Sequence, residues 1–192
     1  MRYNDVVVKR FEFNTVADVL HSYRYAPREV QYYYDFVKAF GSLEGFRLPK
    51  LLAYFEKKCW WKFHYVNGII MEYVSGAREI NSSEIMLTVP LFVHLYRKCI
   101  CHSDLHFGNI LFCPENKMLY PIDYNKCFFF KKPNWKALLI SVAHFLDMGQ
   151  IPDDMGKNFL VTILQALPEL HLDQQEAWKY VSHLLSIWSK GN

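Results

Sequence analysis

The sequence predicts an α+β protein with two lobes, a reduced β-rich N-terminal lobe and a helical C-terminal lobe. Short runs of apolar and β-branched residues gather in the first third of the chain, whereas helix-spaced apolar residues dominate the rest. No repeat, low-complexity tract or Gly/Ser linker divides the chain. Its 192 residues, 52% of them hydrophobic, are enough for one core. We therefore expect a single domain, residues 1–192, with residues 1–74 as the N-terminal lobe and 75–192 as the C-terminal lobe.

The N-terminal lobe is expected to hold three strands and one helix. Three consecutive valines, Val6-Val7-Val8, favour an extended backbone, because β-branched side chains suit a pleated sheet. Pro27 precedes a run in which apolar residues recur at helical spacing, and Gly41 follows that run. A turn is expected around Asn67-Gly68. The predicted elements are a strand at 5–11, a helix at 28–40 and strands at 51–55 and 69–74.

The C-terminal lobe is expected to be mostly helical. A helical stretch should run from Ser82 to about Lys98, with Ser82 or Ser83 as its N-cap and a kink at Pro90. Short strands are expected beside the loop that follows this stretch, and three helices should complete the chain. The strands are predicted at 110–112 and 119–122, and the helices at 135–148, 154–166 and 173–189.

The loop from His102 to Leu111, together with Ile122-Asp123, carries the pattern on which the functional hypothesis depends. Asp104 stands five residues before Asn109, and Asp123 lies fourteen residues after Asn109. Phosphoryl transfer from ATP needs a carboxylate that orients and deprotonates an acceptor hydroxyl, and amide and carboxylate oxygens that hold Mg²⁺ against the phosphates. The spacing therefore predicts Asp104 as the catalytic base and Asn109 and Asp123 as the Mg²⁺ ligands.

Lys9 and Glu29 are candidates outside this loop. Lys9 follows the three valines, and Glu29 lies 20 residues further on, near the start of the next predicted helix. The pair resembles the ion pair of kinases, in which a helix glutamate orients the strand lysine toward the α- and β-phosphates of ATP. A lysine at a strand edge is otherwise usually exposed to solvent, and that alternative stays open at this point.

The segment from Ile69 to Val74 resembles the strand and hinge that join the two lobes of a kinase. Backbone groups of Glu72, Tyr73 and Val74 would hydrogen-bond the adenine edge of ATP there. Backbone recognition puts no demand on side-chain identity, so a plain buried strand is the alternative.

Two histidines flank the predicted base. His102 is expected to brace the loop backbone, and His106 to position phosphates or to face solvent. Two histidines around Asp104 also suggest a metal-dependent hydrolase. No further His, Asp or Glu cluster in the sequence has ligand spacing, and that alternative leaves Lys9, Glu29 and Asp123 without a role.

Taken together, these stretches resemble the protein-kinase-like superfamily. They are most similar to the lipopolysaccharide core (heptose) kinases of Gram-negative bacteria, and the loop is shared with aminoglycoside-phosphotransferase-like and choline-type small-molecule kinases. The resemblance implies a minimal two-lobed protein-kinase-like fold and ATP- and Mg²⁺-dependent transfer to a sugar hydroxyl of a lipopolysaccharide-type glycolipid or a related small molecule. The stretches that carry it are residues 8–11, 68–76, 104–109 and 122–123.

The sequence departs from the kinase pattern in its phosphate-covering region. It contains no Gly-x-Gly-x-x-Gly, and only eight residues precede Lys9. Either upstream residues are missing, or the protein is a minimal kinase that covers ATP with another element. A catalytically silent pseudokinase is a further alternative, because an uncovered phosphate site loses positioning and water exclusion.

The segment after Asp123 is also unusual for a kinase. Tyr124-Asn125 replaces Phe-Gly, and about a dozen residues lead to the helix expected at Trp135. A protein substrate normally docks on a longer segment, which favours a small or glycan acceptor, although a minimal protein kinase of the bacterial effector type stays an alternative. The segment suits an anionic acceptor, but a solvated basic face explains it as well. Its basic residues are Lys126, Lys131, Lys132 and Lys136.

Composition bounds the remaining partners and the location. A net charge of +3 is too small to indicate nucleic-acid binding. The five cysteines include no CxxC pair, which favours reduced thiols. No signal-peptide pattern and no apolar run of about 20 residues occurs. We expect a cytoplasmic protein that contacts ATP, its acceptor and, at the inner face of the membrane, the lipid surface.

Overall fold

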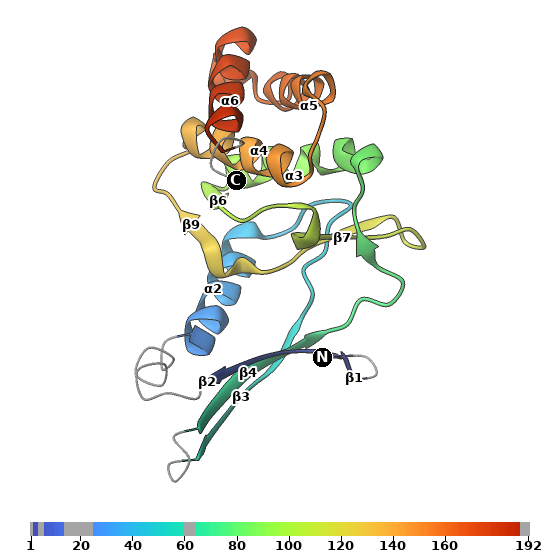
Figure 1. Cartoon of the computed structure of the whole chain (residues 1–192), viewed down its shortest axis with the longest axis vertical. Helices are drawn as coiled ribbons and strands as arrows, with labels where there is room; N and C mark the ends of the chain where they lie inside the picture. Colours follow the sequence, from blue (N-terminus) through green and yellow to red (C-terminus); the bar gives the residue numbers. More distant parts are fainter. Residues whose placement is uncertain (1, 4–5, 14–24, 60–63, 189–192) are drawn as a thin grey trace.

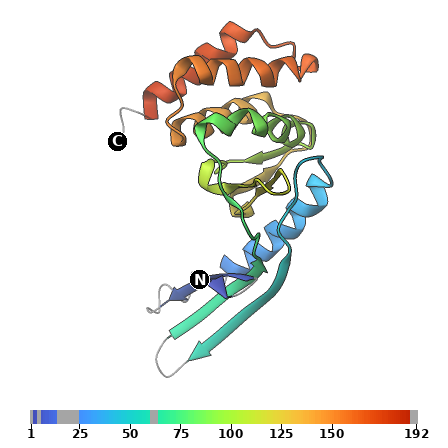
Figure 2. The ribbon, with the colours of Figure 1, turned by 90° about the vertical axis from the view of Figure 1, so that its right-hand side faces the viewer.

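The computed structural model has two lobes, as the sequence predicts (Figures 1 and 2). One end of the molecule is an antiparallel sheet, the other end is a set of helices, and helix α2 (Tyr25–Phe40) leads from the first toward the second. The α+β fold class is therefore confirmed. The structure describes residues 2–3, 6–13, 25–59 and 64–188.

The N-terminal lobe contains a four-stranded antiparallel sheet. Its strand order is β1-β2-β4-β3, and β2 and β4 pair in register with Lys9 opposite Ile69. The strands span β1 Arg2–Tyr3, β2 Val6–Phe13, β3 Leu51–Cys59 and β4 His64–Glu72. The predicted strands at 5–11 and 51–55 fall on β2 and β3, and the structure makes both longer.

The predicted turn at Asn67-Gly68 is wrong. Both residues lie inside β4, where Gly68 pairs with Arg10 on one side and Phe55 on the other. A Cβ on Gly68 would overlap the carbonyl oxygen of Lys9 and lie 2.7 Å from Cζ of Phe55. Gly68 allows the neighbouring strands to lie close together. From the sequence alone, a glycine of this kind cannot be distinguished from one in a hairpin turn.

Helix α2 joins the sheet to the C-terminal lobe. It begins three residues before the predicted start, so Pro27 lies within its first turn. Phe36 and Phe40 on its inner side are 0% and 1% exposed. The ring of Phe36 stacks on the ring of Tyr124 from the C-terminal lobe, with centroids 4.4 Å apart. This aromatic contact fixes α2 against the segment that follows Asp123.

The predicted helix at 82–98 is two elements rather than one kinked helix. The 3₁₀ helix η2 (Ser82–Thr88) is capped by Asn81, not by Ser82 or Ser83, and Glu84 completes a capping box. Helix α3 (Val89–Arg97) then starts with Pro90 in its first turn. Proline stabilises a helix start because its missing N–H has no partner to lose there.

The middle of the C-terminal lobe holds two small sheets and two 3₁₀ turns. One sheet has the order β5-β7-β8, and the other pairs β6 with β9. The predicted strands at 110–112 and 119–122 fall on β7 and β8. The strands are β5 Arg78–Glu79, β6 Ile100–His102, β7 Ile110–Cys113, β8 Met118–Pro121 and β9 Cys127–Phe129, and the turns are η3 Phe107–Asn109 and η4 Tyr124–Lys126.

Helices form the end of the C-terminal lobe and confirm the prediction closely. The predicted helix at 135–148 matches α4 (Trp135–Met148). The helix predicted at 154–166 begins and ends one residue earlier, and the one predicted at 173–189 begins one residue later, while its predicted last residue lies outside the described residues. They are α5 (Asp153–Gln165) and α6 (Gln174–Trp188), with a 3₁₀ turn η5 (Pro168–Leu170) between them. None of the helices in the described residues is long and apolar enough to cross a membrane.

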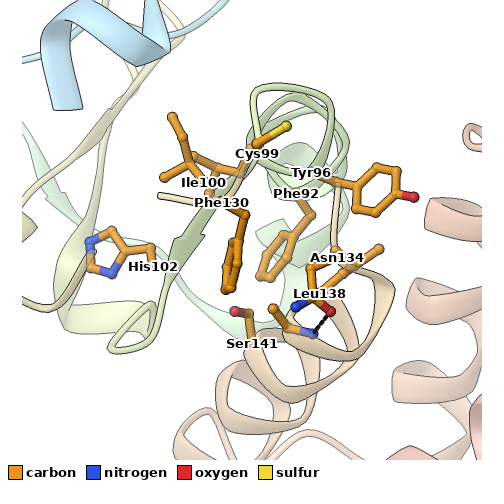
Figure 3. A pocket seen from close by; sticks show the side chains of 11 residues that line it. Phe92, Tyr96, Cys99, Ile100, His102, Phe130, Asn134, Leu138 and Ser141 are labelled. Carbon is orange, nitrogen blue, oxygen red and sulfur yellow. Dashed lines mark hydrogen bonds between the residues drawn. The ribbon is translucent and has the colours of Figure 1, made fainter. Parts of the chain in front are cut away.

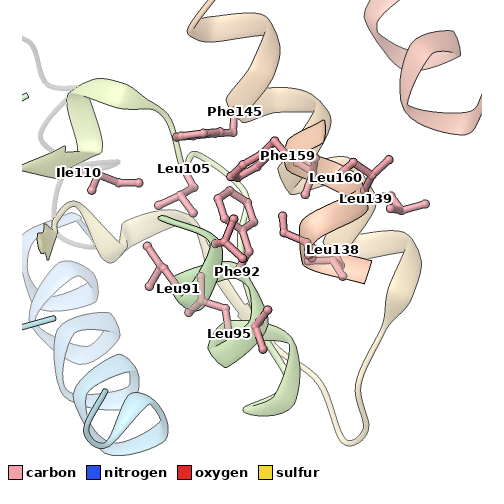
Figure 4. Close-up of a cluster of buried hydrophobic side chains, with 14 of the residues drawn as sticks. Leu91, Phe92, Leu95, Leu105, Ile110, Leu138, Leu139, Phe145, Phe159 and Leu160 are labelled. Carbon is pink, nitrogen blue, oxygen red and sulfur yellow. The ribbon is translucent and has the colours of Figure 1, made fainter. Parts of the chain in front are cut away.

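The core of the C-terminal lobe reaches into the loop that carries Asp104. Phe92, Phe145 and Phe159 form a cluster with ring centroids 5.3–5.5 Å apart, as Figure 4 shows. Leu105 and Ile110 are both 0% exposed in the same core. Burial of Leu105 fixes the backbone directly after Asp104, so the loop is held by apolar packing.

Candidate active site

A cleft of about 250 Å³ lies between the two lobes. Its walls come from β2, α2 and the end of β4 on one side and from β7 and the Ile122-Asp123 loop on the other. Seven of the predicted site residues line it, from parts of the sequence up to 114 residues apart. These are Lys9, Glu29, Glu72, Tyr73, Val74, Asn109 and Asp123.

Lys9 connects the two lobes inside the cleft. Its Nζ lies 2.6 Å from Oε1 of Glu29 and 3.0 Å from Oδ1 of Asp123. Burial lowers the pKa of Lys9, but the hydrogen bonds and charges of the two carboxylates together raise it by more than burial lowers it. The pKa of Lys9 is therefore above its ordinary value. Lys9 is therefore cationic at neutral pH and aimed into the cleft, not an exposed strand-edge lysine.

Glu29 is nearly buried. Its carboxylate is held by Lys9, while its relative exposure is only 7%. Burial raises the pKa of Glu29 by more than Lys9 lowers it, and the nearby charge of Asp123 raises it further. The ammonium at 2.6 Å is what makes a carboxylate tolerable at this depth.

Asp123 has an unusual backbone conformation. Its φ and ψ of 61° and 68° lie in the left-handed region, which costs a non-glycine residue energy and is often found at functional sites. Oδ1 is paired with Lys9, and Asp123 itself lines the cleft. The backbone N–H of the preceding Ile122 donates to the carbonyl of Asn109 at 2.9 Å, which ties the two loops together.

Asn109 and Asp123 have the chemistry that a magnesium site requires. Asn109 is 7% exposed, and its Nδ2 donates to the backbone oxygen of Asp104 at 2.8 Å. That hydrogen bond fixes the amide and leaves its oxygen as a possible ligand. Mg²⁺ prefers oxygen ligands and is commonly held by one or two protein side chains together with substrate phosphates. The two residues therefore fit the ion.

Asp104 lies outside the cleft lining, beyond Asn109. Lys126 Nζ donates to its Oδ2 at 2.9 Å, and His144 Nε2 lies 3.5 Å from its Oδ1. Partial burial raises the pKa of Asp104, but the hydrogen bond and charge of Lys126, followed by His106 and His144, outweigh it. The pKa is therefore below its ordinary value, and the carboxylate is ionised and able to accept a proton at neutral pH.

The two histidines of the loop have structural contacts. His102 is 1% exposed, and its Nε2 lies 3.2 Å from the carbonyl oxygen of Ile122. Burial lowers its pKa to about 4, so the ring is neutral and donates that hydrogen bond, next to Asp123. His106 caps η3, because its Nδ1 accepts the N–H of Gly108. Within the described part of the chain, no three His, Cys, Asp or Glu side chains are grouped to hold a metal ion.

The segment between the lobes begins at Glu72. Its carboxylate accepts from Arg47 Nη2 at 2.5 Å and from the backbone N–H of Lys50, and its own N–H donates to the carbonyl of Lys50. The Glu72 side chain thus braces the chain that precedes β3. Tyr73 and Val74 follow at the mouth of the cleft, where the sequence predicts recognition of adenine by backbone groups.

Two neighbours of Asp104 are not apparent from the sequence pattern. His144 lies 40 residues away on α4, and no spacing rule links it to the loop. Lys126 is visible only as one of several lysines in a basic segment. Its position three residues after Asp123, at the end of η4, is the one local signal that could have singled it out.

Comparison with known proteins identifies the fold. No family model and no curated protein matches the sequence. Among solved structures, the chain is similar to WaaP in complex with acyl carrier protein, with a TM-score of 0.58 and 13% sequence identity. The match covers 84% of this chain and 75% of that chain. At this identity the similarity shows the fold alone, which is a minimal two-lobed protein-kinase-like fold.

Proposed function

We propose that this protein is a kinase that uses ATP and Mg²⁺ to phosphorylate a sugar hydroxyl of a lipopolysaccharide-type glycolipid or a related small molecule. The observation that carries the proposal is the shared cleft. Lys9, Glu29, Asn109 and Asp123 line one cavity between the lobes, and Asp104 is joined to it through the Asn109 side chain. The kinase-like fold and the resemblance in the loop support the same reaction.

Each residue of the cleft has a separate task in this proposal. The ammonium of Lys9, held by Glu29, binds the α- and β-phosphates of ATP. Asn109 and Asp123 hold Mg²⁺, which when bound neutralises charge on the phosphates. Backbone groups of Tyr73 and Val74 contact the adenine. The nucleotide is thus positioned by residues from both lobes, and such positioning supplies much of the rate enhancement in phosphoryl transfer.

Asp104 accepts the proton of the acceptor hydroxyl in the proposed reaction. As the acceptor oxygen forms a bond to the γ-phosphorus, the bond from that phosphorus to the β,γ-bridging oxygen breaks and ADP leaves. The acceptor hydroxyl gives its proton to the Asp104 carboxylate. The low pKa of Asp104 keeps this carboxylate ionised before the step.

The acceptor class is argued from the segment between Asp123 and α4. Only eleven residues separate Asp123 from Trp135, which leaves little chain on which a peptide could dock. Four lysines lie in or just after this segment, at 126, 131, 132 and 136, with no acidic residue among them. A phosphorylated glycan complements such a surface through charge-assisted hydrogen bonds.

The proposal is tested by transfer of label from γ-labelled ATP with Mg²⁺. Purified lipopolysaccharide and a protein lysate are offered as acceptors to the wild type and to Asp104→Asn, which keeps the size of the side chain but removes its basicity. We expect labelled glycolipid with the wild type and a loss of at least about 10²-fold with the variant. ATP binding by Asp104→Asn should be unchanged, because Asp104 lies outside the cleft lining.

The same experiment separates the alternatives. Label in a protein band that depends on Asp104 would replace the glycolipid acceptor by a protein one and indicate a minimal protein kinase. ATP binding without transfer to either fraction would indicate a silent pseudokinase. Wild-type turnover in Asp104→Asn would remove Asp104 as the base.

A further inference from the structure

The segment between β9 and the start of α4 exposes an unusual number of aromatic side chains. Phe128, Phe129 and Phe130 are 57%, 41% and 38% exposed, and Trp135 is 37% exposed. We call residues 128–136 the aromatic-basic segment. Figure 1 shows β9 and the loop that follows it along one side of the molecule. Exposed aromatic rings this close together in sequence are uncommon on soluble surfaces and mark a contact site.

The backbone holds this segment in a defined position. Phe128 and Phe129 pair with Cys101 and Ile100 of β6, and the N–H of Phe130 donates to the carbonyl of Cys99 at 2.8 Å. The ring of Phe130 lines a small internal cavity beside Phe92, as Figure 3 shows. Phe130 is therefore packed in part against the lobe, and Phe128, Phe129 and Trp135 supply most of the exposed aromatic surface.

The two preceding rings lie on opposite faces of the β6–β9 pair. Side chains of directly paired residues share a face, so Phe128 lies on the same face as Cys101, whose sulfur is 3.3 Å from Oγ of Ser141 on α4. Because side chains alternate along a strand, Phe129 points to the other face. Both rings are thus presented to solvent from one exposed strand.

The segment is also rich in positive charge. Lys131, Lys132 and Lys136 are exposed within it, and Lys136 Nζ lies 5.5 Å from the centre of the Trp135 ring. Residues 124–146 contain four lysines and no Asp or Glu. The whole chain has 22 basic and 19 acidic residues, so removing these four leaves 18 basic against 19 acidic. The net positive charge of the protein is therefore concentrated here.

We propose that the aromatic-basic segment docks the protein on the surface of an anionic lipid bilayer. Phenylalanine and tryptophan rings insert at the level of the headgroups, while lysine ammonium groups remain beside the anionic phosphates. A second copy of this chain is a poor occupant, because a two-fold contact would place Lys131 and Lys132 of the two copies against each other. An anionic lipid surface offers an apolar region for the aromatic rings and negative charges for the lysines.

Docking here places the bilayer beside the candidate active site. Lys126, two residues before Phe128, is bound to Asp104. An acceptor hydroxyl held at the membrane surface would then reach Asp104 without leaving the lipid. This proposal goes beyond the proposed kinase activity and stands independently of it, because vesicle binding needs no nucleotide.

The test is co-sedimentation with vesicles of phosphatidylcholine alone and of phosphatidylcholine with 30% phosphatidylglycerol as a roughly physiological anionic content. Without ATP, the wild type should bind the anionic vesicles. Salt at 0.5 M should release it, because the Debye length falls to roughly 4 Å and the attraction between the lysines and the anionic lipids is screened. Lys131→Glu/Lys132→Glu should weaken binding at least about tenfold, since each lysine near an anionic surface contributes roughly fivefold. Phe128→Ser/Phe129→Ser should weaken binding to the anionic vesicles at low salt as well, because the rings that insert at the headgroups are gone.

Matched controls lie outside the segment. Lys117→Glu/Lys157→Glu makes the same change in net charge at two exposed positions, one in the turn between β7 and β8 and one on α5, and should retain binding. Ile187→Ser removes an apolar side chain that is 50% exposed and should also retain it. Equal binding by all variants, or no binding of the wild type to anionic vesicles, overturns the proposal. A dimer that Phe128→Ser/Phe129→Ser dissolves, without vesicle binding, would assign the surface to a second copy instead.

Discussion

At the residue scale, Asp104 illustrates how a candidate base is prepared by its neighbours. Its carboxylate is paired with Lys126 at one oxygen and lies near His144 at the other. Both groups favour the ionised form and lower the pKa of Asp104 against the effect of burial. In the proposed reaction, an anionic acceptor that reaches Asp104 would also meet the Lys126 ammonium, which lies 2.9 Å from Oδ2 of Asp104. We infer that Lys126 positions Asp104 and receives the acceptor.

Lys126→Met tests this inference through the pH dependence of transfer. Removing the ammonium takes away the largest effect that lowers the pKa of Asp104, so that pKa rises. The base is then protonated at higher pH, so the acidic limb of the kcat/KM profile should shift to higher pH. KM for an anionic acceptor should rise as well. Lys131→Met, an exposed lysine five residues away, should leave the acidic limb in place.

His102 gives the fold a dependence on pH that is separate from catalysis. Its pKa is about 4 in the folded state, because burial disfavours the charged ring. The unfolded chain binds a proton at this residue near pH 6.5, whereas the folded chain does not until about pH 4. Protonation therefore favours the unfolded state as the pH falls through this window. The free energy of unfolding therefore decreases as the pH falls from 6.5. The stability that the neutral His102 ring contributes is lost by about pH 4.

Urea unfolding of the wild type and of His102→Gln at pH 7 and pH 5 measures this contribution. Glutamine retains an N–H donor for the carbonyl of Ile122 but does not titrate. The wild type should lose about 2 kcal/mol more than the variant between the two pH values. Between pH 8 and pH 7 the two proteins should change in parallel. A variant that loses as much stability as the wild type on acidification would place the titrating group elsewhere.

At the scale of secondary structure, β4 shows why the turn prediction at Asn67-Gly68 is wrong. A glycine in sequence is compatible with a tight turn or with close approach of neighbouring strands, and local patterns do not distinguish the two. The register places Gly68 between Arg10 and Phe55, and the absence of a side chain lets the strand that bears Lys9 lie close. The position of the Lys9 ammonium therefore depends on a glycine that belongs to another strand.

Gly68→Ala should weaken nucleotide binding from a distance. The new methyl group would overlap the Lys9 carbonyl and the Phe55 ring, which displaces β2 or β3 at a cost of about 1–3 kcal/mol. We expect a lower melting temperature and several-fold weaker ATP binding, with the helical lobe still folded. Ala53→Ser, an exposed position on β3, is the control. Unchanged ATP affinity in Gly68→Ala would show that the sheet adjusts without moving Lys9.

At the scale of the whole molecule, the two lobes meet through a few defined contacts. Lys9 and Asp123 are 114 residues apart and form an ion pair across the cleft. The stack of Phe36 on Tyr124 supports the same junction from the side of α2. A nucleotide in the cleft would contact both lobes, so its binding should stabilise the molecule as a unit.

Lys9→Met tests whether nucleotide binding depends on this junction. With ATP and Mg²⁺ at 100 times Kd, ligand binding stabilises the wild type by about 2.7 kcal/mol, and a tenfold weaker Kd reduces this to about 1.4 kcal/mol. We expect the variant to lose at least half of its ATP-dependent stabilisation in thermal unfolding. The comparison uses the ATP-induced change, because Glu29 left without its partner lowers the stability of the variant itself. Arg10→Met, the exposed neighbour, should keep the full effect.

The sequence by itself predicted the longer strands and helices in their order and seven residues that line the cleft, but not the short strands β1, β5, β6 and β9. The helix at 135–148 is identical in prediction and structure, because its apolar period and its Asn134 cap are local signals. The spacing of Asp104, Asn109 and Asp123 indicated a phosphate-transfer loop without any knowledge of the fold.

The tertiary structure decided which groups surround each of these residues. Capping by Asn81, the register of Gly68 and the approach of His144 to Asp104 depend on backbone positions that no short segment specifies. The pairing of Lys9 with Asp123, and of Lys126 with Asp104, required the lobes and loops to be packed. Distance through the chain does not determine distance in space, and charges influence a carboxylate only at the separations that the packed fold sets.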